Sequence, residues 1–213
     1  MIEGARIDMA AHNNDPATHM RDIIAYWETV AAVQRFIDMH PDTAMISTSD
    51  HETGGMTLGV DPKYVWYPQA LAPVKRSAAS ICTDIKRVPV EMRMDYVSNV
   101  VFPRFMGIDD ATQQEKLAIV KGSSMSVDMC HRFVGQAVST RARIGWTTGG
   151  HTGGDVGLYS YGAGTSDLQG SYENVQINDY MVKYLGVDMV PVTRRLANET
   201  IQQSSFYEHP LID

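Results

Sequence analysis

The feature that most constrains the fold is a long helical pattern followed at once by a short strand pattern and a polar, glycine-rich loop. The helix is predicted to begin at Pro16, with Asp15 as its N-cap, and to end at His40-Pro41. Residues 43–49 are rich in β-formers, which predicts a buried strand. A strand that runs into Asp50-His51 and two glycines indicates an α/β fold with its chemistry at the strand end. Apolar residues recur at helical spacing at Met20, Ile23, Ile24, Trp27, Val30, Ala31 and Ile37.

A second pattern, interrupted by several prolines, occupies residues 62–143. Helical spacing recurs there in three stretches, around Ile81, Val120 and Val134. We interpret this region as a largely helical insertion, because strand patterns precede it and return at residues 144–147. Further along, residues 156–161 predict a strand, and residues 177–185 predict a helix ended by Gly186. An irregular tail is expected from Pro191.

The composition is that of a globular protein and argues against two classes of function. Of the 213 residues, 44% are hydrophobic and 20% are charged, which is enough to bury a core. The net charge of −7 and the lack of a basic stripe predict no nucleic-acid partner. No apolar run approaches the roughly 18 residues needed to span a bilayer, and the first residues carry no signal-peptide pattern.

Two cysteines, Cys82 and Cys130, leave the redox state open. They form no CxxC motif, so they are either a disulfide in an oxidising compartment or two separate buried thiols. The tripeptide Asn198-Glu199-Thr200 fits the N-glycosylation pattern, which is weak support for a secretory route because the pattern is common by chance.

Three short clusters hold most of the residues able to bind a metal ion, and each is expected in a loop or at a strand end. Zinc takes imidazole nitrogen and carboxylate oxygen, whereas magnesium prefers carboxylates. Asp8 and His12 are four residues apart and could bind one ion together, and Asp50-His51 could bind a second. His151 is flanked by glycines that let the backbone approach an ion, and the lone carboxylate of Glu3 suits a harder ion.

Each cluster taken alone has a simpler interpretation. An Asp-x-x-x-His pair is usually two surface residues, Glu52 could serve only as an N-cap partner, and the glycines around His151 could form a flexible loop. Taken together and in this order, the clusters favour a two-metal site, which is a standard arrangement for hydrolysing phosphate esters.

Three ordered motifs in this chain resemble the alkaline phosphatase family. They are Glu3-Gly-Ala-Arg-Ile-Asp8 with His12, Thr48-Ser-Asp50-His51-Glu-Thr-Gly-Gly55, and His151-Thr-Gly. The stretch Asn14-Asp-Pro-Ala-Thr18 is most similar to fungal and vacuolar-type members. The resemblance implies that Asp8, His12 and His151 bind one zinc, Asp50 and His51 bind a second zinc, and Glu3 binds magnesium.

The resemblance also implies a fold, an assembly and a location. Residues 1–213 would form a single partial domain, the C-terminal part of a three-layer α/β/α sandwich, in which residues 62–143 match the small crown-like insertion. The full-length protein would be a homodimer. The family usually enters the secretory path, which implies a vacuole, lysosome-like or extracytoplasmic location, although this chain shows no signal or membrane anchor.

The chain departs from the family pattern mainly at the motif that carries the catalytic serine. This serine stands in an Asp-Ser-Ala-type motif upstream of the first cluster, and no such motif occurs here. The upstream aspartate that bridges the second zinc and magnesium, and the arginine that binds phosphate, are also missing. Serines such as Ser47, Ser49 and Ser124 lie outside that context, so we assign none of them a catalytic role.

We therefore interpret the chain as the C-terminal half of a Zn/Mg phosphomonoesterase that needs an N-terminal half for activity. Loss of the covalent route and of phosphate positioning should each cost several orders of magnitude in rate. Two alternatives stay open: a non-catalytic metal-binding or interaction protein, and a related phosphodiesterase, sulfatase or phosphomutase.

Overall fold

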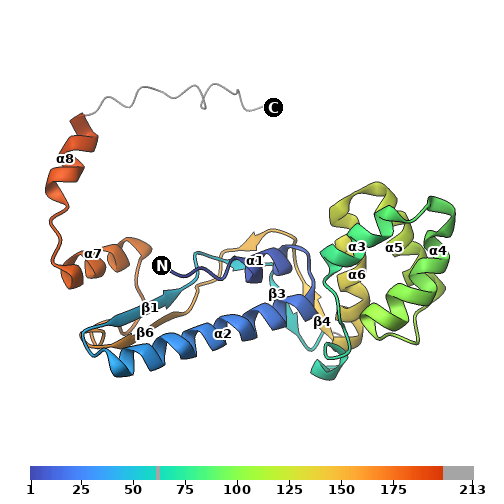
Figure 1. Ribbon diagram of the computed structural model, residues 1–213, viewed down its shortest axis with the longest axis horizontal. Coiled ribbons are helices and arrows are strands. Elements are labelled where there is room, and N and C mark those ends of the chain that lie inside the picture. Colours follow the sequence, from blue (N-terminus) through green and yellow to red (C-terminus); the bar gives the residue numbers. More distant parts are fainter. Residues whose placement is uncertain (61–62, 199–213) are drawn as a thin grey trace. The chain divides into compact units, whose positions relative to one another are not determined.

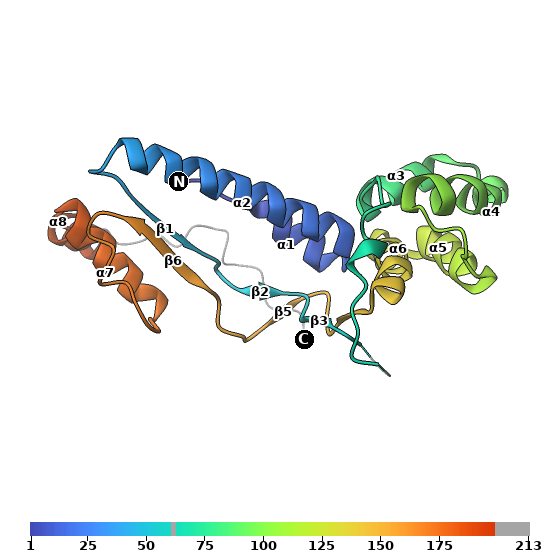
Figure 2. The ribbon, with the colours of Figure 1, turned by 90° about the horizontal axis from the view of Figure 1, so that it is seen from below.

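The computed structural model describes residues 1–60 and 63–198. The chain divides into two compact units, Met1–Gly162 and Ala163–Asp213. Both helices and strands are present, as the predicted α/β class requires. Figures 1 and 2 together give the labels of the α-helices and strands. The expectation of a single domain over residues 1–213 stays a prediction.

Two consecutive helices begin the first unit, α1 (Ala5–His12) and α2 (Pro16–Met39). The predicted start of α2 is confirmed, because the carboxylate of Asp15 accepts a hydrogen bond from the Thr18 amide at 3.1 Å and Pro16 holds the first position. Helix α1 was not predicted; its eight residues include Asp8 and His12 of the first candidate cluster, whereas Glu3 precedes the helix. The expectation that the cluster lies in a loop or at a strand end is therefore wrong for Asp8 and His12.

The apolar stripe of α2 is only partly covered. Figure 2 shows α2 running beside the ribbon of β1 and β6, and Ile37 is buried there. Ile23, Ile24 and Trp27 remain 43%, 47% and 68% exposed. The helix itself is confirmed, but helical spacing alone does not say which of its apolar residues find a partner.

The strands of the first unit form three antiparallel pairs that follow one another along a ribbon. The first three strands pair with the last three in reverse order, so the ribbon is a long hairpin interrupted by loops. One arm contains β1 (Ala44–Thr48), β2 (Glu52–Thr53) and β3 (Met56–Leu58), and the other contains β4 (Ile144–Trp146), β5 (His151–Thr152) and β6 (Leu158–Gly162). The predicted strands at residues 43–49, 144–147 and 156–161 correspond to β1, β4 and β6.

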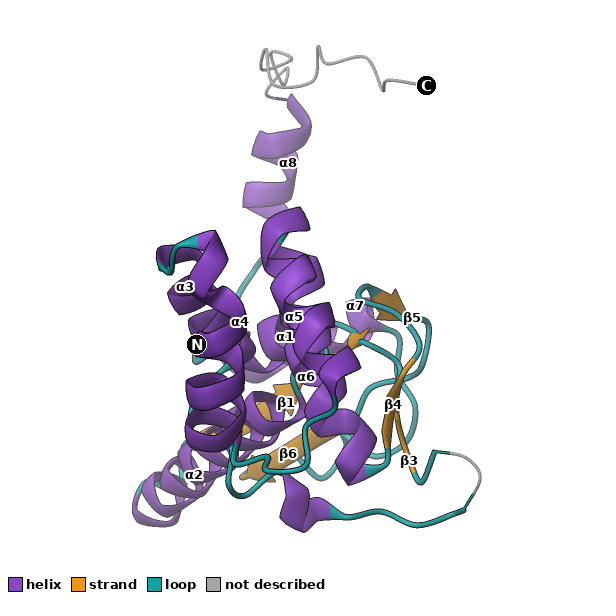
Figure 3. Ribbon diagram, turned by 90° about the vertical axis from the view of Figure 1, so that its right-hand side faces the viewer, coloured by secondary structure: helices purple, strands orange, loops and turns teal. Residues whose placement is uncertain are grey.

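The segment between β3 and β4 is helical, as the spacing predicted. Figure 1 shows these helices grouped to the right of the strands, and Figure 3, viewed from that side, shows them in front of β1 and β6. They supply most of the buried core, including Ile81, Phe102 and Ile119. The elements are η1 (Pro68–Ala70), α3 (Ala78–Arg87), η2 (Val90–Met92), α4 (Arg93–Tyr96), the π-helical η3 (Val97–Met106), α5 (Gln113–Met125) and α6 (Val127–Ala142).

The structure decides between the two alternatives for the cysteines. Cys82 of α3 and Cys130 of α6 form a disulfide that links residues 48 positions apart. Both cysteines are buried in the helical core. The bond therefore connects the start of the helical segment to its last helix.

Helix α6 packs against the turn between α1 and α2 at Gly135. A Cβ atom added to Gly135 would lie 2.2 Å from the carbonyl oxygen of Asn14, which is part of the backbone and has little room to move. Only glycine allows this close approach of helix and turn.

We expect Gly135→Ala to destabilise the chain by about 1–3 kcal/mol, because the overpacking outweighs the better helix propensity of alanine. Urea unfolding with Gln136→Ala, an exposed neighbour on the same helix, as the control measures this difference. Equal midpoints for the two variants would contradict the close packing of α6 on the turn.

The second unit contains α7 (Asn174–Leu185) and α8 (Val190–Asn198). The predicted end of α7 is confirmed, since Gly186 takes the left-handed conformation with φ 62°. The expected irregular tail from Pro191 is wrong up to residue 198, because Pro191 lies in the first turn of α8, where a backbone N–H has no partner within the helix. In the glycosylation pattern Asn198-Glu199-Thr200, residues 199–200 and the side chain of Asn198 lie outside what is described.

Within residues 1–60 and 63–198, no helix combines the length and the apolar character that crossing a membrane requires.

Candidate metal centre

Asp8 and His12 lie one turn apart on α1 and point in the same direction. This is the i, i+4 relationship that brings side chains together on one face of a helix. Nε2 of His12 is 3.3 Å from Oδ1 of Asp8. The two side chains therefore converge on one face of a helix, and that they bind one metal ion together stays a prediction.

His151 reaches the same point from β5, far along the sequence. Its Nε2 lies 3.2 Å from Nε2 of His12 and 4.0 Å from Oδ1 of Asp8. Ligand atoms of the three residues all lie within 4.8 Å of one another. Two imidazole nitrogens and one carboxylate oxygen face a common point, so this trio could hold one metal ion.

The orientation of His12 is set by the loop that precedes His151. Nδ1 of His12 lies 2.7 Å from the carbonyl oxygen of Gly149, which can only accept a hydrogen bond. In a neutral ring the proton would then sit on Nδ1, which leaves the lone pair of Nε2 free for a metal ion on the side of Asp8 and His151. A backbone carbonyl commonly fixes a metal-binding histidine in this way.

Asp50 and His51 lie directly beside this trio, between β1 and β2. The two side chains pair with each other, Nε2 of His51 being 3.3 Å from Oδ2 of Asp50. The ring of His51 stacks on that of His151 with centroids 3.7 Å apart. Asp50 is 86% exposed at its side chain, so this second pair is open on one side.

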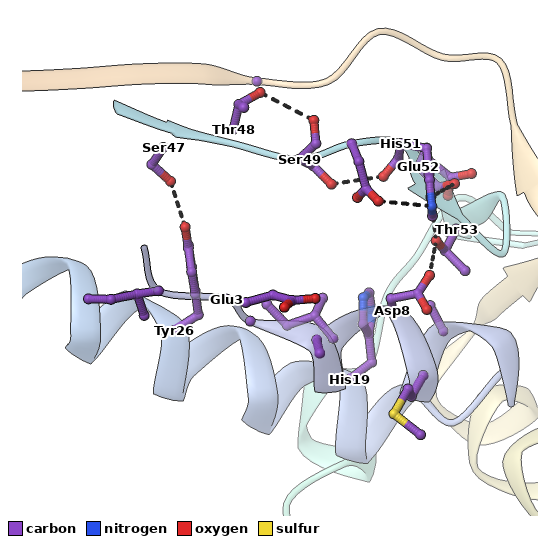
Figure 4. Close-up of a pocket in the computed structure, with 18 of the residues that line it drawn as sticks. Glu3, Asp8, His19, Tyr26, Ser47, Thr48, Ser49, His51, Glu52 and Thr53 are labelled. Atoms are coloured by element: carbon purple, nitrogen blue, oxygen red, sulfur yellow. Dashed lines mark hydrogen bonds and ion pairs between the residues drawn. The ribbon is translucent and has the colours of Figure 1, made fainter. Parts of the chain in front are cut away.

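Glu3 lies in the segment that leads into α1 and is exposed. It lines a cavity of about 690 Å³ together with Asp8, Asp50 and His51. Figure 4 shows Glu3 and Asp8 on the α1 side of this cavity and His51 on the strand side. Glu3 and the Asp50-His51 pair thus share a cavity with Asp8 without belonging to the group of three converging ligands.

The pattern of known alkaline phosphatases matches residues 1–187 of the chain. The chain belongs to the alkaline phosphatase family. It is 35% identical over 206 residues to the alkaline phosphatase of Schizosaccharomyces pombe and 31% identical over 226 residues to the repressible alkaline phosphatase of Saccharomyces cerevisiae. These matches cover 94% and 97% of this chain but only 38% and 39% of the two yeast proteins.

Solved alkaline phosphatases share the fold. The crystal structure of a cold-active alkaline phosphatase from a psychrophilic Shewanella superposes with a TM-score of 0.74 at 30% identity, covering 86% of this chain and 44% of that one. The Thermus thermophilus alkaline phosphatase superposes with a TM-score of 0.65 at 26% identity, covering 76% of this chain and 37% of that one. The predicted fold class, an α/β fold of alkaline-phosphatase type, is therefore confirmed, and the chain spans less than half of each of these two proteins.

Thr53 connects the two candidate ligand groups of this member of the alkaline phosphatase family, and it was not predicted from the sequence. Its hydroxyl donates to Oδ1 of Asp8 at 2.7 Å and lies 3.2 Å from Nδ1 of His51. Thr53 stands two residues after His51 and pairs with His151 in the antiparallel β2–β5 pair. This register places its hydroxyl beside Asp8 and His51. The signal in the sequence that could have pointed to Thr53 was its position within the Asp-His-Glu-Thr-Gly-Gly motif.

The carboxylate of Glu52 links strands β2 and β5 and does not join the candidate metal ligands. Its carboxylate accepts hydrogen bonds from the hydroxyl and amide of Thr152 and from the amide of Gly55. The hydrogen bond from the Thr152 hydroxyl is the largest of the effects that lower the pKa of Glu52, so this carboxylate stays ionised. The simpler interpretation of Glu52 as an N-cap partner is wrong, because it joins β2 to β5.

Ser47, Ser49 and Ser124 each form a hydrogen bond with another residue of the chain. Ser47 and Ser49 do line the cavity. The hydroxyl of Ser47 bonds to that of Tyr26 at 2.7 Å, and the hydroxyl of Ser49 donates to the carbonyl oxygen of His51 at 2.9 Å. Ser124 lies on α5 in the helical segment, where its hydroxyl bonds with Arg93.

His19 of α2 also lines the cavity and was not singled out by the sequence analysis. Its ring meets the edge of Trp146 at a centroid distance of 5.8 Å. Burial lowers the pKa of His19, which outweighs the opposite effect of nearby Asp15, so the ring is neutral near pH 7.

Proposed function

We propose that this chain supplies the metal-binding part of a phosphate monoester hydrolase with two zinc ions and one magnesium ion. The observation that carries the proposal is the convergence of Asp8, His12 and His151 within 4.8 Å. Family membership supports it, because alkaline phosphatases generally use metal ions. Matches to proteins named alkaline phosphatase favour this reaction over that of a related phosphodiesterase or sulfatase.

The donor atoms of the trio fit zinc. Two imidazoles and one carboxylate form a set of three protein ligands, which leaves a fourth position open for catalysis. We assign the second zinc to Asp50 and His51, beside the trio, and the magnesium to Glu3, a lone carboxylate on the same cavity. When bound, such ions supply Lewis-acid chemistry that neutralises charge on phosphoryl oxygens.

The residues of this chain position the ligands but do not supply the nucleophile. Gly149 orients His12, and Thr53 holds Asp8 at the edge of the cavity. The two serines on the cavity are engaged with Tyr26 and with the His51 carbonyl. We therefore propose that the attacking serine and the phosphate-binding arginine come from outside these 213 residues, and that this chain alone does not turn over substrate.

We also propose a secretory or vacuolar location and a homodimeric full-length protein. The disulfide between Cys82 and Cys130 supports the location, because such bonds form and persist in oxidising compartments.

The proposal is tested by counting metal bound to the purified 213-residue chain after dialysis against zinc and magnesium. Hydrolysis of a chromogenic phosphate monoester near pH 9 is measured on the same samples. We expect bound zinc without turnover. A chain that binds no zinc would refute the metal centre, whereas turnover that is lost in His151→Ala would show that a nucleophile lies within the chain.

A further inference from the structure

The motif Asn14-Asp-Pro-Ala-Thr18 has no part in the proposed chemistry, yet it begins directly after the ligand-bearing helix. Helix α1 ends at His12, and Asn14 takes the left-handed conformation with φ 51°. The amide of Asn14 bonds to the carbonyl of Ala11 at 2.9 Å, and that of Asp15 bonds to Ala10 at 3.0 Å. These two bonds form a Schellman cap, which ends α1 at His12.

The side chain of Asn14 forms hydrogen bonds that a helix cap does not need. Its Nδ2 lies 3.0 Å from the carbonyl oxygen of Ala11 and 2.9 Å from that of Thr148. Both partners are acceptors, so the NH₂ group must face them, and its two protons are sufficient for both bonds. One amide therefore joins the last turn of α1, which carries His12, to the loop that leads into His151.

The residues on either side of Asn14 hold the turn in place from the helical segment. Oδ1 of Asn13 accepts a hydrogen bond from Nδ1 of His131 on α6 at 2.9 Å. The carboxylate of Asp15 is buried and accepts a hydrogen bond from the amide of Ala78 at the start of α3 at 2.7 Å. The turn is thus fixed to α3 and α6, while Asn14 points the other way, toward the metal-binding loop.

We infer that Asn14 is a positioning residue that sets the separation of His12 and His151 and thereby the zinc affinity of the trio. This inference rests on the proposed metal centre. The Asn14–Thr148 bond and the His12–Gly149 bond connect the same two segments at adjacent residues. Without the first bond, the hydrogen bond that remains between residues 148–149 and the end of α1, among those the structure describes, is the one to the ligand His12 itself.

Asn14→Gly separates this role from the cap. Glycine is the preferred residue at a left-handed helix end, so the variant keeps the turn and loses only the side-chain bonds. We expect its zinc affinity to fall roughly 10- to 100-fold, the usual cost of removing a group that orients a metal ligand. The absorption spectrum of bound Co²⁺ should change as well, because the ligand geometry changes. Asn14→Asp should weaken binding similarly, since a carboxylate cannot donate to two carbonyls.

The control is Thr112→Ala, which removes the capping box of α5 in the helical segment. It should lower the unfolding midpoint while leaving zinc affinity and the Co²⁺ spectrum unchanged. Asn14→Gly should lower the zinc affinity and change the Co²⁺ spectrum by more than its effect on the unfolding midpoint accounts for. If both variants reduce zinc affinity in proportion to their loss of stability, Asn14 is only a structural residue and the inference is wrong.

A second measurement does not depend on metal. In the metal-free chain, amide hydrogen exchange over residues 147–152 should be about five-fold faster in Asn14→Gly, as expected for the loss of one hydrogen bond. Exchange in α3 and α6 should not change. Unchanged exchange over residues 147–152 would overturn the inference, whereas a wild-type chain that binds no zinc would refute the proposed metal centre and leave the exchange result to decide the role of Asn14.

Discussion

Replacing His151 by alanine is expected to weaken zinc binding by more than roughly 100-fold, because removing a ligand costs more than removing a group that orients one. The variant takes one of three converging donors from the trio and leaves Asp8 and His12, which are only 3.3 Å apart. His151 is 46% exposed at its side chain and makes no large contribution to the core, so the chain should remain folded. Competition with a zinc-binding dye measures the affinity.

His40→Ala is the matched control for this substitution. His40 follows the last residue of α2, where its ring stacks on Phe36 at a centroid distance of 4.1 Å. Both variants remove one partly exposed imidazole, so a non-specific effect of losing a histidine would appear in both. Equal zinc affinity in His151→Ala and the wild-type chain would mean that the ion binds elsewhere, and the assigned centre would be incorrect.

Removing the disulfide is expected to destabilise the chain by about 4 kcal/mol, the value that the chain-entropy model gives for a loop of this length. The bond connects α3 to α6 across 48 positions, so its loss frees a large part of the helical segment in the unfolded state. The double variant Cys82→Ala/Cys130→Ala is the suitable test, because both sites are buried and serine would place unpaired hydroxyls there. Denaturant unfolding measures the change.

Reduction of the wild-type chain provides an independent comparison. If the crosslink itself stabilises the fold, a thiol reductant should lower the unfolding midpoint of the wild-type chain and leave that of the double variant unchanged. A wild-type midpoint that does not respond to reductant would contradict the contribution assigned to the disulfide. A response in both chains would mean that the reductant acts on something other than this bond.

Local patterns were sufficient for the elements whose ends carry their own signals. Helix α2 begins at Asp15-Pro16 and stops before Pro41 because capping and proline geometry act within a few residues. Helix α1 was missed for the opposite reason. It is only eight residues long, no side chain caps its start, and its polar residues read as a binding cluster. Burial of the α2 stripe could not be read either, because spacing does not say which strands cover Ile37 and leave Trp27 exposed.

The order of the motifs also identified the residues of the candidate centre, but not how they meet. The ligand types and the family resemblance follow from residue identity, which the sequence contains in full. The contact between Asp8 and His151 depends on the antiparallel register in which Thr53 faces His151. A shift of one residue in that pairing would turn His151 to the opposite face of the strand. Thr53 owes its role to the same register, and so it was found only in the structure.

The sequence by itself determined the family, the α/β class and the kind of ligands available, because these depend on residue types and on spacing over a few turns. The tertiary structure alone decided that Cys82 and Cys130 are bonded and that Asn14 joins the segments of His12 and His151. Bringing together residues 48 and 134 positions apart depends on how helices and strands pack, and the free energy of that packing is shared among many contacts. No local pattern records it.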